Sequence, residues 1–263
     1  MSHPSRARGS HASPSTSWQK VAPWYNKLVG SEGQYYHQHV VLPGSIKLLD
    51  LQPTSNLLDL GCGQGILARS VPEVSHYLGL DTSATLIEEA RKLNKNEKYL
   101  FQVRNVARTI LGAQSTFTHA AIILALQNMS DPAIALENAA KYLVKGGTLL
   151  IVLNHPCFRI PRQSGWGIDE QTKIQYRWIN RYNSPLKIPI TTHPGQSDSG
   201  VTWSFHFSLH EYMQMLRKTG FAITNLEEWS SDKESVGKAA KMENRSRSEF
   251  PLFLALVCKK QID

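Results

Sequence analysis

The sequence has few cysteines, no long apolar run and no acidic residue in its first 17 positions. Three cysteines occur in 263 residues, and they are widely spaced and odd in number. That pattern disfavours a disulfide framework and favours a reducing compartment, so we expect a cytoplasmic protein. The longest apolar runs, AAIILAL and TLLIVL, are too short to cross a bilayer and are typical of buried strands.

Histidines with the spacing of metal ligands are also lacking. His206 and His210 are four residues apart, but a helix is predicted to begin between them. The two side chains then do not share a helical face, and we expect no metal site. No internal repeat is present, which excludes solenoids and propellers.

The first 16 residues contain too few apolar side chains to offset the entropy of ordering them, and we predict a disordered tail. Arg6, Arg8 and several serines give this tail a faint likeness to a transit peptide, although a plain flexible tail is the favoured interpretation. The net charge of +8 is spread along the chain rather than clustered. It therefore gives little support to a nucleic-acid partner.

From residue 56 the patterns of strand and helix alternate, which predicts βα units and a parallel sheet. Ser83 is a predicted N-cap, and Asp131 with Pro132 opens a further helix that we expect to end at Gly146-Gly147. Ser208 and Glu211 form a predicted capping box. The expected strands are NLLDL, HYLGLD, KYLFQVRN, THAAIILA, TLLIVL, FAITNLE and PLFLALVC.

Residues 154–207 break this rhythm, because prolines, aromatics and arginines occur there without a helical period. We interpret the segment as an inserted cap that ends in a strand, VTWSFHF. A polar connection, residues 229–250, separates the last two strands.

The turn in NLLDLGCGQG lies between a strand and a helix, where backbone amides can face a ligand. Its spacing is G-x-G-x-G, which differs from the G-x-G-x-x-G of dinucleotide-binding proteins. Asp59 precedes the first glycine by two residues, a position suited to a positively charged amino group. Asp81 closes the next strand, where it can accept hydrogen bonds from ribose hydroxyls. A ligand with a ribose and a charged amino-acid part, S-adenosylmethionine, meets these demands.

The motifs LLDLGCGQG, LGLDTS and FTHAAIILALQNMSDPAIALENAAKYLVKGGTLLIV resemble successive motifs of the class I S-adenosylmethionine-dependent methyltransferases. The resemblance covers roughly residues 50–153. It implies an α/β, Rossmann-like fold with a seven-stranded, mostly parallel sheet in the order 3-2-1-4-5-7-6. The last strand would be antiparallel, and helices would cover both faces.

The resemblance also implies S-adenosyl-L-methionine as cofactor and a role for each matched residue. Gly61, Cys62, Gly63 and Gly65 would shape the loop around the methionine part, with Asp59 near it. Asp81 would hold the ribose, and Thr82 would flank the adenosine. The adenine would be bordered by Asn105 and Val106, and Leu124 would touch the cofactor from below.

Related proteins use their N-terminal segment as a lid, which implies a helical lid over residues 17–55 and a methyltransferase domain over residues 56–263 with the insertion 154–207. Tyr25 could then reach the methionine carboxylate. All six tryptophans lie outside residues 56–152, which favours an aromatic substrate pocket above the sheet, although packing explains any single tryptophan. The expected substrate-binding residues are Trp24, Arg159, Arg162 and Trp166, with solvated arginines as the alternative.

His155 and His206 are the candidate general bases, and a buried structural histidine is the alternative for each. The leading hypothesis is methyl transfer to a small-molecule acceptor at oxygen, nitrogen or activated carbon. An RNA or protein methyltransferase is the second, although no RNA-binding module is appended and LQNM stands after the fourth strand where adenine-N6 enzymes have a Pro-Pro motif. A non-enzymatic scaffold is the third. The sequence leaves the oligomeric state open.

Overall fold

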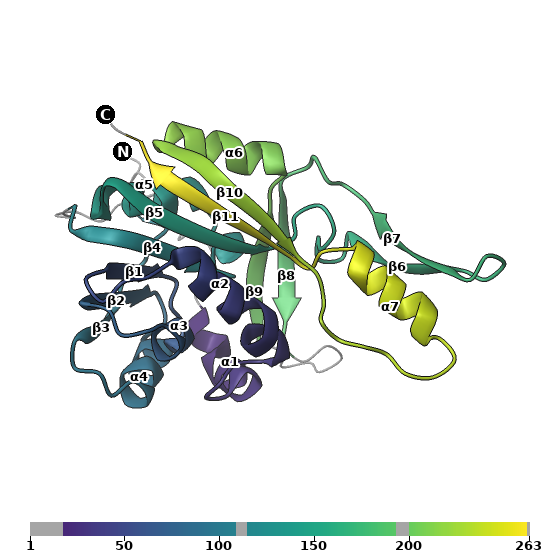
Figure 1. Ribbon diagram of the computed structural model, residues 1–263, viewed down its shortest axis with the longest axis horizontal. Coiled ribbons are helices and arrows are strands. Elements are labelled where there is room, and N and C mark those ends of the chain that lie inside the picture. Colours follow the sequence, from purple (N-terminus) through teal and green to yellow (C-terminus); the bar gives the residue numbers. More distant parts are fainter. Residues whose placement is uncertain (1–17, 109–114, 193–199, 262–263) are drawn as a thin grey trace, which may run out of the picture.

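A seven-stranded sheet forms the centre of the protein in the computed structural model, which describes residues 18–108, 115–192 and 200–261 (Figure 1). Its strand order is β3-β2-β1-β4-β5-β11-β10. The strands of this sheet are β1 (Asn56–Leu60), β2 (His76–Asp81), β3 (Tyr99–Val103), β4 (Phe117–Ile123), β5 (Leu143–Asn154), β10 (Phe221–Trp229) and β11 (Phe253–Lys260).

The pairing directions confirm the predicted topology. β1 is parallel to both β2 and β4, and β4 is parallel to β5. β11 is antiparallel to both of its neighbours, β5 and β10. Counted along the chain within this sheet, the order is 3-2-1-4-5-7-6 with the last strand antiparallel, as the resemblance implied. β2 and β3 lie on one side of β1, and β4 and β5 lie on the other, so the strand order reverses at β1. A crevice opens beyond the carboxyl end of the strand at such a reversal.

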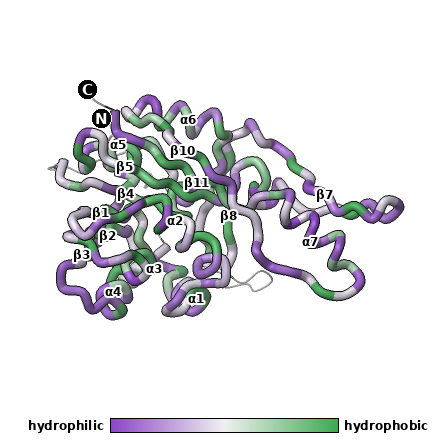
Figure 2. Tube along the Cα trace, in the orientation of Figure 1, coloured by the Kyte–Doolittle hydropathy of each residue, from purple (hydrophilic) through white to green (hydrophobic). Residues whose placement is uncertain are grey.

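Helices cover both faces of the sheet, and among the described residues none is long and apolar enough to cross a bilayer. α5 and α6 pack on one hydrophobic cluster, while α2, α3 and α4 pack on the cluster of the opposite face. Figure 2 shows the hydrophobic stretches concentrated along the central strands. The helices are η1 (Trp18–Val21), α1 (Ala22–Val29), η2 (His37–Val41), α2 (Leu42–Leu49), α3 (Ile66–Ser70), α4 (Ala84–Leu93), η3 (Leu126–Asn128), α5 (Pro132–Tyr142), α6 (Leu209–Lys218) and α7 (Ala240–Glu249).

The predicted helix starts are confirmed by their caps. Ser83 accepts a hydrogen bond from the backbone N–H of Leu86, and Asp131 accepts one from that of Ile134. At α6 the capping box of Ser208 and Glu211 is complete. Each cap satisfies an N–H group that a helix leaves unpaired at its start.

The predicted end of α5 at Gly146-Gly147 is wrong. The helix ends at Tyr142, and Leu143 already pairs with Phe117 of β4 as the first residue of β5. Leu143 is fully buried there, because its apolar side chain packs in the core as part of the strand and does not extend the helix by a further turn. The two glycines lie within the strand, Gly146 with a φ of 71°.

The insertion is more regular than the sequence indicates, because it folds into two β-hairpins. β6 (Ser164–Asp169) pairs with β7 (Ile174–Ile179), and β8 (Leu186–Thr191) pairs with β9 (Val201–His206). α7, which the sequence analysis assigned to a polar connection, packs beside β7. In Figure 1 these three elements, β6, β7 and α7, extend away from the main sheet, whereas β8 and β9 lie close beside it, below β10 and β11 in this view.

Candidate active site

Three glycines with positive φ shape the loop between β1 and α3. Gly61, Gly63 and Gly65 have φ values of 83°, 54° and 73°, which glycine adopts far more easily than other residues. The loop is tied to β2, because the N–H groups of Gly61 and Cys62 both donate to the carbonyl of Leu80, at 2.7 and 3.1 Å. A side chain at Gly61 would stand 2.6 Å from the Cβ of Ala125. The loop therefore requires glycine for both conformation and space.

Asp81 at the end of β2 holds the glycine loop in place. Its Oδ2 accepts from the N–H of Gly63 at 3.0 Å, and its Oδ1 accepts from the N–H of Ser83 at 2.8 Å. Burial raises the pKa of this carboxyl, while the backbone donors of Ser83 and Gly63 oppose the rise. Each carboxylate oxygen keeps a further lone pair, so the group can also accept from two hydroxyls of a ligand.

Asp59 on β1 and Cys62 within the loop both have buried side chains. Asp59 is almost fully buried and accepts a hydrogen bond from the hydroxyl of Tyr77. Burial raises the pKa of Asp59 to about 7, against the lowering effect of the Tyr77 hydrogen bond. Burial also raises the pKa of the Cys62 thiol well above its usual value, which makes the thiol unreactive.

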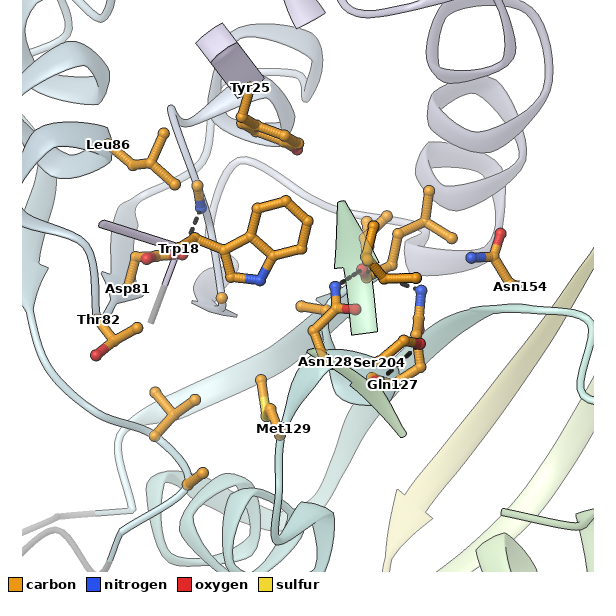
Figure 3. A pocket seen from close by; sticks show the side chains of 18 of the residues that line it. Trp18, Tyr25, Asp81, Thr82, Leu86, Gln127, Asn128, Met129, Asn154 and Ser204 are labelled. Carbon is orange, nitrogen blue, oxygen red and sulfur yellow. Dashed lines mark hydrogen bonds between the residues drawn. The ribbon is translucent and has the colours of Figure 1, made fainter. Parts of the chain in front are cut away.

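A cavity of about 300 Å³ opens above the loop at the carboxyl ends of the strands (Figure 3). At one end it meets the loop, Asp81 and Thr82, and at the other it meets the segment after β4 and the β8–β9 hairpin. Its lining residues are Trp18, Tyr25, His37, Gly61, Gly63, Asp81, Thr82, Leu86, Asn105, Val106, Ala107, Ile123, Leu124, Ala125, Gln127, Asn128, Met129, Asn154, Pro161, Ile190 and Ser204.

The N-terminal helices contribute two aromatic side chains to this cavity. Trp18 and Tyr25 meet edge to face with ring centroids 5.4 Å apart. A Cβ on Gly63 would lie 3.7 Å from the ring of Tyr25, so this ring packs closely over the bare loop. Burial raises the pKa of Tyr25 to about 12, which keeps its hydroxyl protonated and able to donate. Figure 3 shows the Trp18 indole in the middle of the cavity, between Asp81 and Asn128.

The backbone turns sharply after β4, where Leu124 has a φ of 51°. The side-chain amides of Gln127 and Asn128 both donate to the carbonyl of Leu124 at 3.1 Å. These bonds hold a conformation that is unfavourable for a leucine, and such strain occurs most often at functional sites. The turn places the side chain of Gln127 in the wall of the cavity.

The structure brings together many of the residues that the sequence analysis assigned to a cofactor. Tyr25, Gly61, Gly63, Asp81, Thr82, Asn105, Val106 and Leu124 all line the cavity. Asp59, Cys62 and Gly65 do not line it. Asp59 lies on β1, and Cys62 and Gly65 are loop residues that face the sheet: a Cβ on Gly79 would stand 2.9 Å from Sγ of Cys62, and a Cβ on Gly65 would stand 3.0 Å from the ring of Phe101.

None of the residues predicted to bind the substrate lines the cavity. Arg159 is turned toward the protein, where it donates to Asn154 and to the carbonyl of Leu252. Trp166 lies on the β6–β7 hairpin and packs against Phe250, the residue that follows α7. Trp24 and Arg162 are likewise outside the lining, and Arg162 is exposed.

The two predicted general bases are buried, hydrogen-bonded histidines that also do not line the cavity. The Nε2 of His155 lies 2.7 Å from Oε1 of Glu228, and its Nδ1 accepts from the N–H of Cys157. The Nε2 of His206 donates to the carbonyl of Tyr182 at 2.7 Å. Both have the contacts of structural residues, the alternative that the sequence analysis gave.

Among the lining residues that were not predicted, those with polar or aromatic side chains are Trp18, His37, Gln127, Asn128, Asn154 and Ser204. One signal for two of them was present. LQNM follows the fourth strand directly, and the carboxyl ends of parallel strands face the crevice. His37 and Ser204 lie in segments whose path over the sheet cannot be read from local patterns.

Comparisons with known proteins agree with this fold. Residues 58–151 match the family described as "Methyltransferase domain". A methyltransferase structure from Mesorhizobium loti is 23% identical, with a TM-score of 0.66 over 84% of this chain and 98% of that one. A putative methyltransferase from Listeria monocytogenes is 20% identical, with a TM-score of 0.64 over 82% of this chain and 97% of that one. At these identities the two structures support the fold.

Among curated proteins, the 2-phytyl-1,4-naphtoquinone methyltransferase of Thermosynechococcus vestitus is 28% identical over 144 residues. That alignment covers 53% of this chain and 64% of the relative. An uncharacterized transposon protein from Streptomyces fradiae is 32% identical over 107 residues, 39% of this chain and 31% of the relative. The chain therefore spans less than two thirds of the curated relatives that it matches.

The sheet has the strand order of a Rossmann-like fold. A glycine loop after its first strand and an acid at the end of its second are typical of nucleoside-binding proteins with that fold. The family match places a methyltransferase domain over residues 58–151, and the fold is that of S-adenosylmethionine-dependent methyltransferases of known structure. By their names, the two methyltransferases of known structure depend on S-adenosylmethionine.

Proposed function

We propose that the protein transfers a methyl group from S-adenosylmethionine to a small-molecule acceptor. The observation that carries the proposal is the continuous cavity, which joins the glycine loop at one end to the β8–β9 hairpin at the other. Its volume of about 300 Å³ lies at the lower end of the usual range for small-ligand sites.

The residues at the loop end fit the cofactor. Asp81 keeps free acceptor capacity for ribose hydroxyls after its two backbone bonds. Gly63 offers a bare backbone under the Tyr25 ring, and the protonated Tyr25 hydroxyl can donate to a carboxylate. Asn105 and Val106 border the space next to Thr82, where an adenine would lie.

Bound at this end, the cofactor supplies an activated methyl group on a sulfonium. The protein's own contribution is alignment and the exclusion of water, since the transfer is a direct displacement. Trp18, Tyr25 and His37 cover the cavity from the N-terminal segment, and Pro161, Ile190 and Ser204 cover it from the insertion. Because the cavity is covered by both the N-terminal segment and the insertion, it favours a small acceptor molecule over a group carried on a macromolecule. The naphthoquinone methyltransferase among the relatives acts, by its name, on a small molecule.

The test is incubation with methyl-labelled S-adenosylmethionine and separate small-molecule, RNA and protein extracts of cells. Label is expected in the small-molecule extract, and Asp81→Ala is expected to abolish it by weakening cofactor binding. Label confined to RNA or to protein would contradict the proposal.

A further inference from the structure

The end of the cavity away from Asp81 is lined by polar side chains that carry no fixed charge. They are Gln127, Asn128, Asn154 and Ser204, and His37 also lines the cavity. Burial lowers the pKa of His37, which keeps its imidazole neutral. Among the described residues that line the cavity, Asp81 is the one Asp, Glu, Lys or Arg. It belongs to the cofactor end.

Two of these neutral groups have buried polar atoms that the protein does not satisfy. The Nε2 of Gln127 donates to the carbonyl of Leu124, but its Oε1 has no partner in the described structure. The Nδ1 of His37 is likewise buried without a partner. Gln127 is only 7% exposed, so bulk water does not readily supply the missing bond. An unsatisfied buried group costs about 1–3 kcal/mol, and such groups require an explanation such as a ligand.

Asn154 presents a donor at the same end. Arg159 donates to the Oδ1 of Asn154 at 2.8 Å, and this contact fixes which way the amide is turned. Figure 3 shows the amide nitrogen of Asn154 on the side of the cavity, facing Gln127 and Asn128. The charge of Arg159 is directed at Asn154 and at the carbonyl of Leu252, so it does not reach the cavity.

We propose that this end binds an uncharged acceptor that donates a hydrogen bond to Oε1 of Gln127 and accepts one from the amide of Asn154. The inference rests on the proposed function and names its substrate class, a neutral molecule with a hydroxyl or N–H group. A charged acceptor would lose its hydration here without a counter-charge, which is far more costly than burying a paired neutral group. Gln127 is then a specificity-determining residue, because an acceptor without the donor leaves its Oε1 unpaired.

The first test separates the labelled small-molecule products by ion exchange, so that each product can be traced to its unmethylated parent. Each labelled product is identified by mass, and the charge of its unmethylated parent at pH 7 is assigned. Neutral parents support the inference. Anionic or cationic parents overturn it while leaving the proposed function intact, and label confined to RNA or protein overturns the proposed function instead.

The second test compares Gln127→Leu with Thr202→Val on the acceptor so identified. Thr202 also has a buried hydroxyl without a partner, but it does not line the cavity, so it is the matched control. For Gln127→Leu the acceptor KM should rise about tenfold or more, with the cofactor Kd unchanged within about twofold. Thr202→Val should leave both constants unchanged. An unaltered acceptor KM in folded Gln127→Leu would overturn the inference.

A variant on another element keeps the test decisive if Gln127→Leu does not fold. Asn154→Asp removes the amide donor but keeps the oxygen that Arg159 contacts. It should also raise the acceptor KM about tenfold with cofactor affinity retained. Tighter binding of the acceptor by Asn154→Asp would indicate a cationic acceptor and contradict the inference.

Discussion

The hydroxyl of Tyr77 donates a hydrogen bond to the carboxyl group of Asp59 directly beneath the glycine loop. Burial raises the pKa of Asp59 to about 7. The folded protein thus keeps this proton up to about pH 7, whereas an unfolded chain releases it near the ordinary value of 3.8. Between these values the folded state binds more protons, so this group lowers the free energy of unfolding as the pH rises.

The corresponding prediction concerns Asp59→Asn, which cannot ionise and keeps an oxygen for Tyr77. Between pH 5 and pH 8 the wild type should lose about 1–3 kcal/mol of unfolding free energy relative to the variant. The slope is about 1.4 kcal/mol per pH unit while the folded state holds one proton that the unfolded state has released. Urea unfolding of both proteins without cofactor measures the difference. A difference that does not change with pH would show that Asp59 is already ionised at pH 5.

Asp81→Ala should weaken S-adenosylmethionine binding by about 2–4 kcal/mol, because hydrogen bonds to a charged acceptor are among the strong ones. The loop would also lose the anchor at Gly63. Isothermal calorimetry on folded protein measures the affinity. Asp131→Ala is the control, since Asp131 caps α5 and does not line the cavity. Equal affinities of the two variants would contradict the assignment of Asp81.

Tyr25→Ala should weaken cofactor binding about tenfold or more, since the ring packs over Gly63 and its hydroxyl is a protonated donor. The adjacent variant Trp24→Ala removes an aromatic residue from the same helix but not from the cavity lining. Its cofactor affinity should stay within about twofold of the wild type. The pair is compared by calorimetry, and similar losses in both variants would indicate that the whole helix, rather than Tyr25, is what matters.

Trp166→Ala should lower the melting temperature and leave the kinetic constants unchanged. Trp166 packs edge to face on Phe250 with centroids 5.4 Å apart, and the Arg177 guanidinium lies 5.0 Å from its ring centroid. The side chain is 38% exposed, so we expect a loss of about 1–2 kcal/mol. Differential scanning calorimetry and steady-state kinetics measure the two effects. A raised acceptor KM at a temperature where the variant is folded would restore Trp166 to the substrate site.

His155→Gln and His206→Gln should likewise reduce stability, by about 1–3 kcal/mol each, because they disturb buried hydrogen bonds. Neither histidine lines the cavity, so kcat of the folded variants should stay within about threefold of the wild type. A loss of kcat by a hundredfold with the fold intact would instead identify a general base.

The strands and helix starts of the sheet region were predictable because their signals are local and agree with one another, whereas the strand order followed from the resemblance to a known family. The strand before Gly61, the acid at Asp81 and the caps at Ser83 and Asp131 each depend on a few neighbouring residues. The same signals located the cofactor end of the cavity, since the glycine loop and the end of the next strand must meet at one edge of a parallel sheet.

The elements that escaped prediction depend on contacts distant in sequence. β6 has glycines where its partner strand has large rings, so a Cβ on Gly165 would stand 2.7 Å from Trp178. This pairing becomes visible only when both strands are placed. α7 has no apolar face, and its one buried residue is Ser246. The acceptor end could not be foreseen because η2, η3 and β9 come together only in the folded chain.

The two covers of the cavity touch each other. Gly200 comes just before β9, and a Cβ on it would stand 2.9 Å from Cγ1 of Val21. Val21 lies between Trp18 and Tyr25 in the sequence. The N-terminal cover lies over the cofactor end of the cavity, and the β8–β9 cover lies over the opposite end. Because they meet at Val21, an acceptor that steadies the hairpin also restrains the N-terminal segment. We therefore expect the residence time of one ligand to lengthen when the other is bound, and the spent cofactor to depart fastest once the methylated product has gone.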